Sequence, residues 1–93
     1  MSTELLNGLQ HRSLELHPQV ALRPEPFGAL AYHYGNRRLV FLRHADIVAV
    51  ARCLTEHATL GDALRACRID ERRWPSFLTA FESLITSEVV RER

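Results

Sequence analysis

The chain has 93 residues, of which 46% are apolar, and a formal net charge of +1. This length and composition are typical of one small folded domain and exclude a disordered or fibrous chain. The small net charge also argues against a domain that binds nucleic-acid backbones, since such domains are strongly basic. All twelve cations are arginine, and ten of them follow Asn36.

No segment has the pattern of a membrane span or a signal peptide. The longest uncharged run, residues 26–36, covers eleven residues, whereas a span needs about 20. The two cysteines, Cys53 and Cys67, cannot form a disulfide scaffold and are too widely separated for a metal-ligand pair. We therefore expect a cytoplasmic protein with reduced thiols.

The first third of the chain is expected to be extended. Residues 1–13 contain a short leucine cluster without a sustained period, which predicts a flexible tail before a domain over residues 14–93. From residue 14 to 23, apolar and polar residues alternate around His17-Pro18, which favours a bent extended segment followed by a strand. The run from Pro24 to Gly28 is typical of a turn.

Two more strands are predicted next. Ala29 to Tyr34 alternates, with the larger side chains on one face and two alanines and a histidine on the other. Gly35-Asn36 then predicts a tight turn. The following strand, Arg38 to Arg43, is apolar on both faces, which a strand that only faced water would not need.

After the third strand the apolar period changes from two to 3.6 residues, which predicts three helices. Asp46 is the expected cap of the first helix, which ends near His57. Thr59 opens the second helix, with Asp62 in the capping-box position, and Asp70 is the cap candidate for the third. The third helix has the strongest apolar stripe, formed by Trp74, Phe77, Leu78, Phe81, Leu84 and Ile85. The order β-β-β-α-α-α predicts a compact α+β domain.

No catalytic or metal-binding motif is present. The five histidines are not at helical metal spacing, and there is no HExxH motif or Cys/His cluster. Nucleophile elbows, Walker loops, dinucleotide-binding glycine patterns and a cysteine triplet of the radical SAM type are absent. We therefore expect a binding surface, with no enzyme activity, metal or cofactor.

Two kinds of binding surface remain open. A β-meander followed by three helices is compatible with a winged-helix DNA-binding regulator, although the candidate recognition helix, Trp74 to Glu88, contains no Arg or Lys. The favoured alternative is an extended peptide that pairs with the edge strand at Leu39 to Leu42, steered by the neighbouring arginines if it is acidic. The opposing interpretation is that Arg38 and Arg43 only protect this edge from aggregation, and that the aromatic stripe of the third helix is only core.

The segment from His17 to Leu39, HPQVALRPEPFGALAYHYGNRRL, resembles the signature of the mycofactocin biosynthesis chaperone family. That family belongs to the PqqD-like group of peptide-recognition domains, also called RiPP recognition elements. The approach to the last helix, Asp70 followed by Arg73-Trp74-Pro75, is similar too. The resemblance covers roughly residues 14 to 90 and implies a winged-helix-like fold with three antiparallel strands followed by three helices.

The resemblance also implies a function, that of a non-catalytic chaperone for a ribosomally made precursor peptide. Such a chaperone binds the leader of the peptide and presents it to a radical SAM maturase, which makes a peptide-derived redox cofactor. The leader docks beside the third strand, in its cleft with the third helix. On this sequence the implied peptide-binding residues are Arg37, Arg38, Leu39, Val40, Phe41, Leu42, Arg43, Arg73, Phe77, Phe81 and Leu84. Whether the protein is a monomer or a dimer, and which surface contacts the maturase, stay open.

Overall fold

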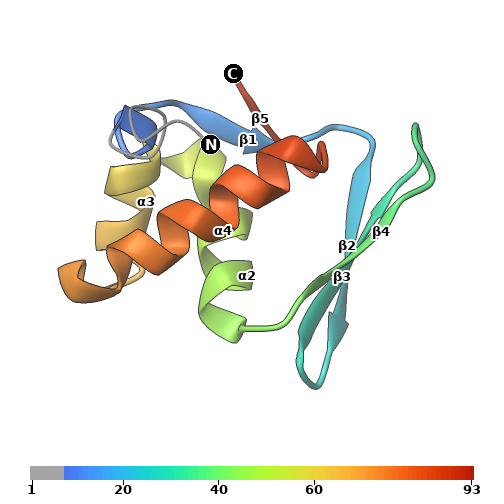
Figure 1. Cartoon of the computed structure of the whole chain (residues 1–93), viewed down its shortest axis with the longest axis horizontal. Helices are drawn as coiled ribbons and strands as arrows, with labels where there is room; N and C mark the ends of the chain where they lie inside the picture. Colours follow the sequence, from blue (N-terminus) through green and yellow to red (C-terminus); the bar gives the residue numbers. More distant parts are fainter. Residues whose placement is uncertain (1–7) are drawn as a thin grey trace.

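A computed structural model describes residues 8–93 of the chain. The elements in chain order are β1 (Leu14–Leu16), β2 (Val20–Glu25), β3 (Gly28–His33), β4 (Leu39–Leu42), α2 (Ala45–Arg52), α3 (Leu60–Ala66), α4 (Trp74–Thr86) and β5 (Val90–Glu92). Short 3-10 turns follow α2 and precede α4. Figure 1 shows the helices gathered on one side of the molecule and the sheet of β2, β3 and β4 standing on the other.

The larger sheet is antiparallel, with the strand order β2-β3-β4. Ala31 in the central strand pairs with Leu22 on one side and Val40 on the other. Successive side chains of a strand point to opposite faces, so Ala29, Ala31 and His33 are buried against the helices. The predicted α+β fold, with three antiparallel strands followed by three helices, is confirmed.

The turn between β2 and β3 contains fewer residues than the sequence predicts. The strands extend to Glu25 and from Gly28, so that only Pro26 and Phe27 lie between them. Gly28 has a φ of +147°, and a Cβ atom there would collide with the backbone carbonyl of Leu42. A glycine is therefore required for β4 to lie against the start of β3.

A second sheet was not predicted from the sequence. β1 pairs in antiparallel fashion with the C-terminal strand β5, from Leu14 opposite Glu92 to Leu16 opposite Val90. The first extended segment thus pairs within its own chain, but not with the larger sheet. Leu14 and Val90 are 0% and 1% exposed, so burial of their side chains accounts for the pairing of these short strands.

The expected tail over the first thirteen residues lies partly outside the described residues. From residue 8 onward the chain packs on the domain, because Leu9 is fully buried. The carbonyl of Gln10 accepts a hydrogen bond of 2.8 Å from the N–H of Gly61. The described part of this segment therefore belongs to the folded domain.

Side chains cap the helices, although not always at the expected residue. The expected Asp46 cap is wrong, because the Nδ1 atom of His44 accepts a hydrogen bond of 3.1 Å from the N–H of Asp46. Thr59 caps α3 as predicted, by accepting from the N–H three residues on. Asp70 caps the 3-10 turn before α4, and its hydrogen bonds from the N–H and side chain of Arg72 hold the pKa of this carboxyl below its usual value.

The core lies between the inner face of the sheet and the three helices. α4 contributes Phe77, Phe81 and Leu84 to it, at the spacing that places side chains on one face of a helix. Pro75 lies in the first turn of α4, where its missing N–H breaks no helical bond. Within residues 8–93, no helix is long and apolar enough to cross a membrane.

Candidate functional site: a groove beside an open strand edge

β4 lies at one edge of the larger sheet. The Arg38 carbonyl accepts a hydrogen bond of 2.9 Å from β3, which sets the alternation along this antiparallel ladder. Val40 and Leu42 consequently direct their N–H and C=O groups toward β3. Leu39 and Phe41 direct theirs away from the sheet, so this edge offers two donors and two acceptors to an added strand.

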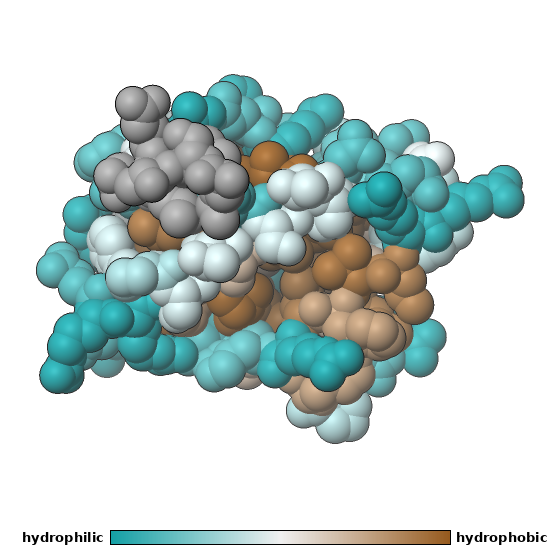
Figure 2. Space-filling model, in the orientation of Figure 1, coloured by the Kyte–Doolittle hydropathy of each residue, from teal (hydrophilic) through white to brown (hydrophobic). Residues whose placement is uncertain are grey.

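An apolar groove runs beside this edge, between β4, the start of α2 and the middle of α4. Its volume is about 320 Å³. Figure 2 shows apolar side chains gathered where β4 approaches the helices in Figure 1. The residues that line the groove are Val40, Phe41, Leu42, Arg43, His44, Ile47, Ala80, Ser83 and Leu84. A strand added to β4 would therefore have an apolar wall next to its side chains.

The structure brings only part of the predicted site together. Val40, Phe41, Leu42, Arg43 and Leu84 line the groove. The others lie elsewhere, in the core, on the opposite face of the sheet or on the surface around it.

The two phenylalanines of the predicted site are core residues. Phe77 is 3% exposed and Phe81 is 0% exposed, and neither residue is among those that line the groove. Arg73 does not line the groove, because its guanidinium pairs with Asp46 at 3.0 Å and lies over the Phe77 ring. Leu39 is 53% exposed on the face of the sheet that points away from the helices.

Four of the lining residues were not predicted from the sequence: His44, Ile47, Ala80 and Ser83. The last two belong to a row of small residues in α4, which begins at Ser76 and continues at helical spacing. Such a row lets another chain approach a helix closely, and in this helix it runs alongside the apolar stripe. The row was visible in the sequence, but nothing in the sequence indicated which side of the stripe faces a groove.

Arginines are placed at both ends of β4. Arg37 and Arg38 precede the strand and Arg43 follows it, and none of the three forms an ion pair with a described residue. The guanidinium of Arg43 lies 5.4 Å from the centre of the Phe41 ring. One carboxylate, that of Glu88, lies near the first end, where it accepts a hydrogen bond from Asn36. The surroundings of the strand are therefore cationic.

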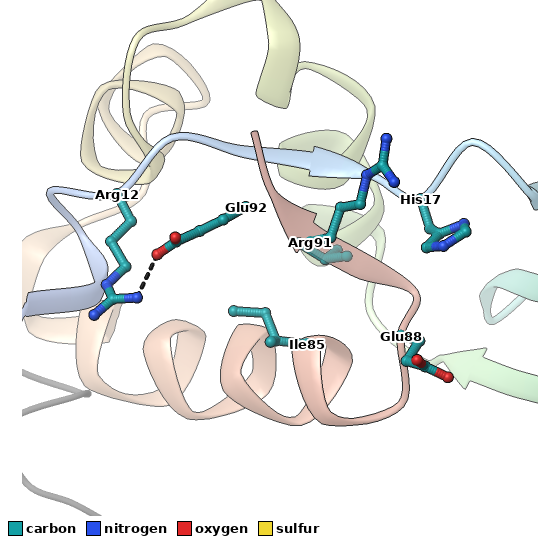
Figure 3. Close-up of a pocket in the computed structure, with 7 residues that line it drawn as sticks. Arg12, His17, Ile85, Glu88, Arg91 and Glu92 are labelled. Carbon is teal, nitrogen blue, oxygen red and sulfur yellow. Dashed lines mark hydrogen bonds and ion pairs between the residues drawn. The ribbon is translucent and has the colours of Figure 1, made fainter.

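A larger cavity of about 490 Å³ lies between the small sheet and the end of α4. Figure 3 shows its charged side chains, and the dashed line marks the ion pair between Arg12 and Glu92. Arg91 is also paired, with Glu15 at 2.7 Å. Since carboxylates already neutralise the cations of this cavity, the groove beside β4 is the better candidate for a peptide.

The structure shows no metal site in the described part of the chain, where no three His, Cys, Asp or Glu side chains are grouped for an ion. Cys53 and Cys67 are distant in sequence, but their Sγ atoms lie 3.4 Å apart. Burial, followed by the hydrogen bond with Cys67, raises the pKa of the Cys53 thiol from 9.0 to about 11. A thiol that keeps its proton at neutral pH is a poor nucleophile, so Cys53 is not a candidate nucleophile.

Fold and groove together define a small recognition domain with an open strand edge. The family model described as the peptide chaperone MftB family matches residues 13–91. The chain therefore belongs to the MftB peptide chaperone family, which confirms the resemblance found in the sequence. It is a chaperone-family protein and not an enzyme.

Three mycobacterial relatives are named peptide chaperone MftB. The protein of Mycobacterium ulcerans is 44% identical over 79 residues, which are 85% of this chain and 72% of the relative. The protein of Mycobacterium tuberculosis is 42% identical over 82 residues, 88% of this chain and 75% of the relative. The protein of Mycolicibacterium smegmatis is 41% identical over 78 residues, 84% and 76% of the two chains. No solved structure shows a significant match.

Proposed function

We propose that this protein binds the leader of a ribosomally made precursor peptide along the outer edge of β4 and presents it to a radical SAM maturase in mycofactocin biosynthesis. The place of action is the cytoplasm, where the peptide is synthesised. One observation carries the docking mode: the open edge of β4 lies directly beside an apolar groove. Membership of a peptide chaperone family supports the choice of ligand.

In strand addition, backbone hydrogen bonds and side-chain contacts contribute differently to peptide binding. The outward N–H and C=O groups of Leu39 and Phe41 hold any extended backbone, whatever its sequence. Alternate side chains of the bound strand point into the groove, where Leu42 and Leu84 provide apolar contacts. These contacts select the peptide.

Charge and chain entropy set the strength of the complex. Arg37, Arg38 and Arg43 attract an acidic leader and speed its association. A disordered leader loses conformational freedom when it docks, so we expect a moderate affinity for the area buried. Holding the peptide near the maturase raises its local concentration, which is the benefit of presentation.

Isothermal titration tests the choice of ligand. We expect saturable one-to-one binding of the acidic leader of the neighbouring precursor peptide, and no binding of a random DNA duplex of similar charge. Binding of DNA alone would favour the winged-helix regulator, although α4 contains no Arg or Lys. Binding of neither would refute leader recognition by the free chain.

A substitution in α4 tests the groove. Ser83 is exposed and lines the groove, so Ser83→Trp should fill it without disturbing the core and weaken leader binding at least tenfold. Thr79→Trp is the matched control, because Thr79 is exposed on the same helix but does not line the groove. Circular dichroism checks that both variants fold. An equal effect of the two variants would contradict docking in the groove.

A further inference from the structure

The face of the larger sheet that points away from the helices, here called the outer face, is apolar although it is exposed. Figure 1 shows no helix or strand of residues 8–93 covering it. Its large side chains and their exposed fractions are Phe27 (42%), Tyr32 (37%), Tyr34 (63%), Leu39 (53%) and Phe41 (51%). The solvent face of an antiparallel sheet is normally polar, and a contiguous apolar patch on a small protein marks an interaction site.

These side chains form one connected surface. Tyr32 packs edge-to-face on Tyr34 with ring centres 5.0 Å apart, and Phe27 packs in the same way on Phe41 at 5.8 Å. Leu39 lies directly opposite Tyr32 in the ladder and two residues before Phe41 on the same face of β4, so it lies between the two pairs. Rings held in this way lose little conformational entropy on binding, and aromatic residues dominate the energetic centres of protein interfaces.

Folding of this chain does not explain the outer face. In β3 the core side receives Ala29 and Ala31, while Tyr32 points to solvent. Beside the buried His33, the strand thus buries two small side chains and exposes a large apolar one, the reverse of what burial of apolar area would favour. Because no described element covers the outer face, its apolar area is left for a partner to bury.

The border of the outer face is cationic. Arg23 lies on the outer face of β2, where Glu25 pairs with it at 2.8 Å, so the excess positive charge of this border comes from the arginines around β4. Arg37, Arg38 and Arg43 surround β4 and form no ion pair with a described residue. The complementary surface is therefore apolar and bordered by carboxylates.

A second copy of this chain does not fit that description. Two outer faces in contact would bring their arginine borders together, and like charges across an interface are unfavourable. Five half-exposed side chains also provide only roughly 400–500 Å², about half of the ~800 Å² that each partner buries in a stable interface. Charge and area both favour a transient contact with a different protein.

We propose that the outer face docks a folded partner with an apolar, carboxylate-bordered surface, and that this partner is the enzyme that receives the bound peptide. This inference rests on the function proposed above. A strand added to β4 continues the sheet, so every second side chain of the peptide emerges beside the outer face. A partner seated there contacts chaperone and peptide together.

The test uses the radical SAM maturase as the probe, titrated onto the complex of this chain with the leader. The double variant Tyr32→Thr/Tyr34→Thr removes two rings but keeps residues that favour strands, and it should weaken maturase binding at least tenfold. Arg23→Glu reverses a charge on the edge opposite the groove and should weaken it about fivefold. None of these residues lines the groove, so leader affinity should stay within twofold. Arg52→Glu, with the same charge change on α2, should bind the maturase like the wild type.

Three other outcomes would refute the proposal, and each identifies which part of it is wrong. Equal maturase binding by the wild type and the double variant refutes the outer face as the docking site and leaves the proposed function intact. A wild type that binds the leader but no maturase refutes both this inference and the presentation step. A wild-type dimer in sedimentation that the double variant abolishes would assign the outer face to a second copy.

Discussion

The two edges of the three-stranded sheet differ in what they offer to another chain. On the β2 edge, the Gln19 carbonyl accepts a hydrogen bond of 2.7 Å from the N–H of Tyr34, the residue after β3. Because the pattern alternates along the strand, the backbone N–H and C=O groups of Val20, Leu22 and Pro24 point away from β3, and proline contributes only its C=O. Pro24 has no N–H, and the N–H of Val20 already donates to the His17 carbonyl. Among the described residues, the N–H of Leu22 is then the one outward donor left on this edge.

The β4 edge keeps both of its outward donors. Leu39 and Phe41 are not proline, and the strand Leu39–Leu42 contains no charged residue, whereas β2 contains Arg23 and Glu25 as well as its proline. Proteins use proline and charge to prevent unwanted strand pairing. One edge of this sheet is thus protected, and the other is left open next to a groove, which is the arrangement that strand addition requires.

Proline substitutions in β4 should produce the largest effects. Val40→Pro removes a donor that points into the ladder, so the free energy of unfolding should fall by on the order of 2–3 kcal/mol. Phe41→Pro removes an outward donor, which an edge strand tolerates, so this variant should fold but bind the leader at least tenfold more weakly. Chemical denaturation and isothermal titration measure the two effects.

Two variants accompany the Phe41 substitution. Phe41→Ala removes the ring but keeps the donor, and its smaller loss of affinity isolates the contribution of the backbone. Leu39→Pro removes the other outward donor and should act like Phe41→Pro. Leader affinity unaffected by either proline in a folded protein would show that the peptide does not pair with this edge.

Removal of the cationic border should have a moderate effect. Replacing Arg37, Arg38 and Arg43 with glutamine should weaken leader binding about fivefold and reduce its dependence on salt, because salt screens exposed charges. Titrations at low and high ionic strength measure this. Equal affinity of the wild-type protein at both salt concentrations would refute electrostatic steering.

Opening the protected edge should have a smaller effect. Pro24→Val restores an outward donor on β2, so the variant should self-associate weakly in a concentration-dependent way, more than the wild type. Sedimentation velocity measures this, and leader binding at β4 serves as the control. If the variant behaves like the wild type, Arg23 and Glu25 are sufficient to protect the edge.

The smallest effect should come from Cys53, which belongs to neither edge. Its pKa is about 11 in the folded protein, against an ordinary value of 9.0. Well below pH 9.0 the thiol is protonated in both states, and its contribution to stability is complete. As the pH rises from 9.0 to about 11 the unfolded thiol ionises first, so the free energy of unfolding falls. Denaturation across this range should show less of this decline in Cys53→Ala, whereas an identical decline would exclude Cys53 as its source.

Much of the architecture followed from local patterns. The change of period from two to 3.6 residues predicted three strands and then three helices, and the alternation in β3 correctly assigned its alanines and His33 to one face. The third strand was expected to be an edge, and five of the site residues that the family resemblance implies line the groove beside it. The elements and the alternation in β3 depend on residues a few positions apart, which a sequence pattern can show, whereas the groove joins β4 to a helix far along the chain.

Other features depend on tertiary contacts between segments that are far apart in sequence. The pairing of β1 with β5 and the contact of Cys53 with Cys67 join residues far apart in sequence. Helical spacing showed which residues of α4 share a face, but only packing decided that Phe77 and Phe81 enter the core while Ala80 and Ser83 line the groove. The free donors of β4 depend on strand register, and register is a relation between two segments. The sequence by itself therefore determined the elements and their order, and tertiary contacts determined which surfaces remain open for a partner.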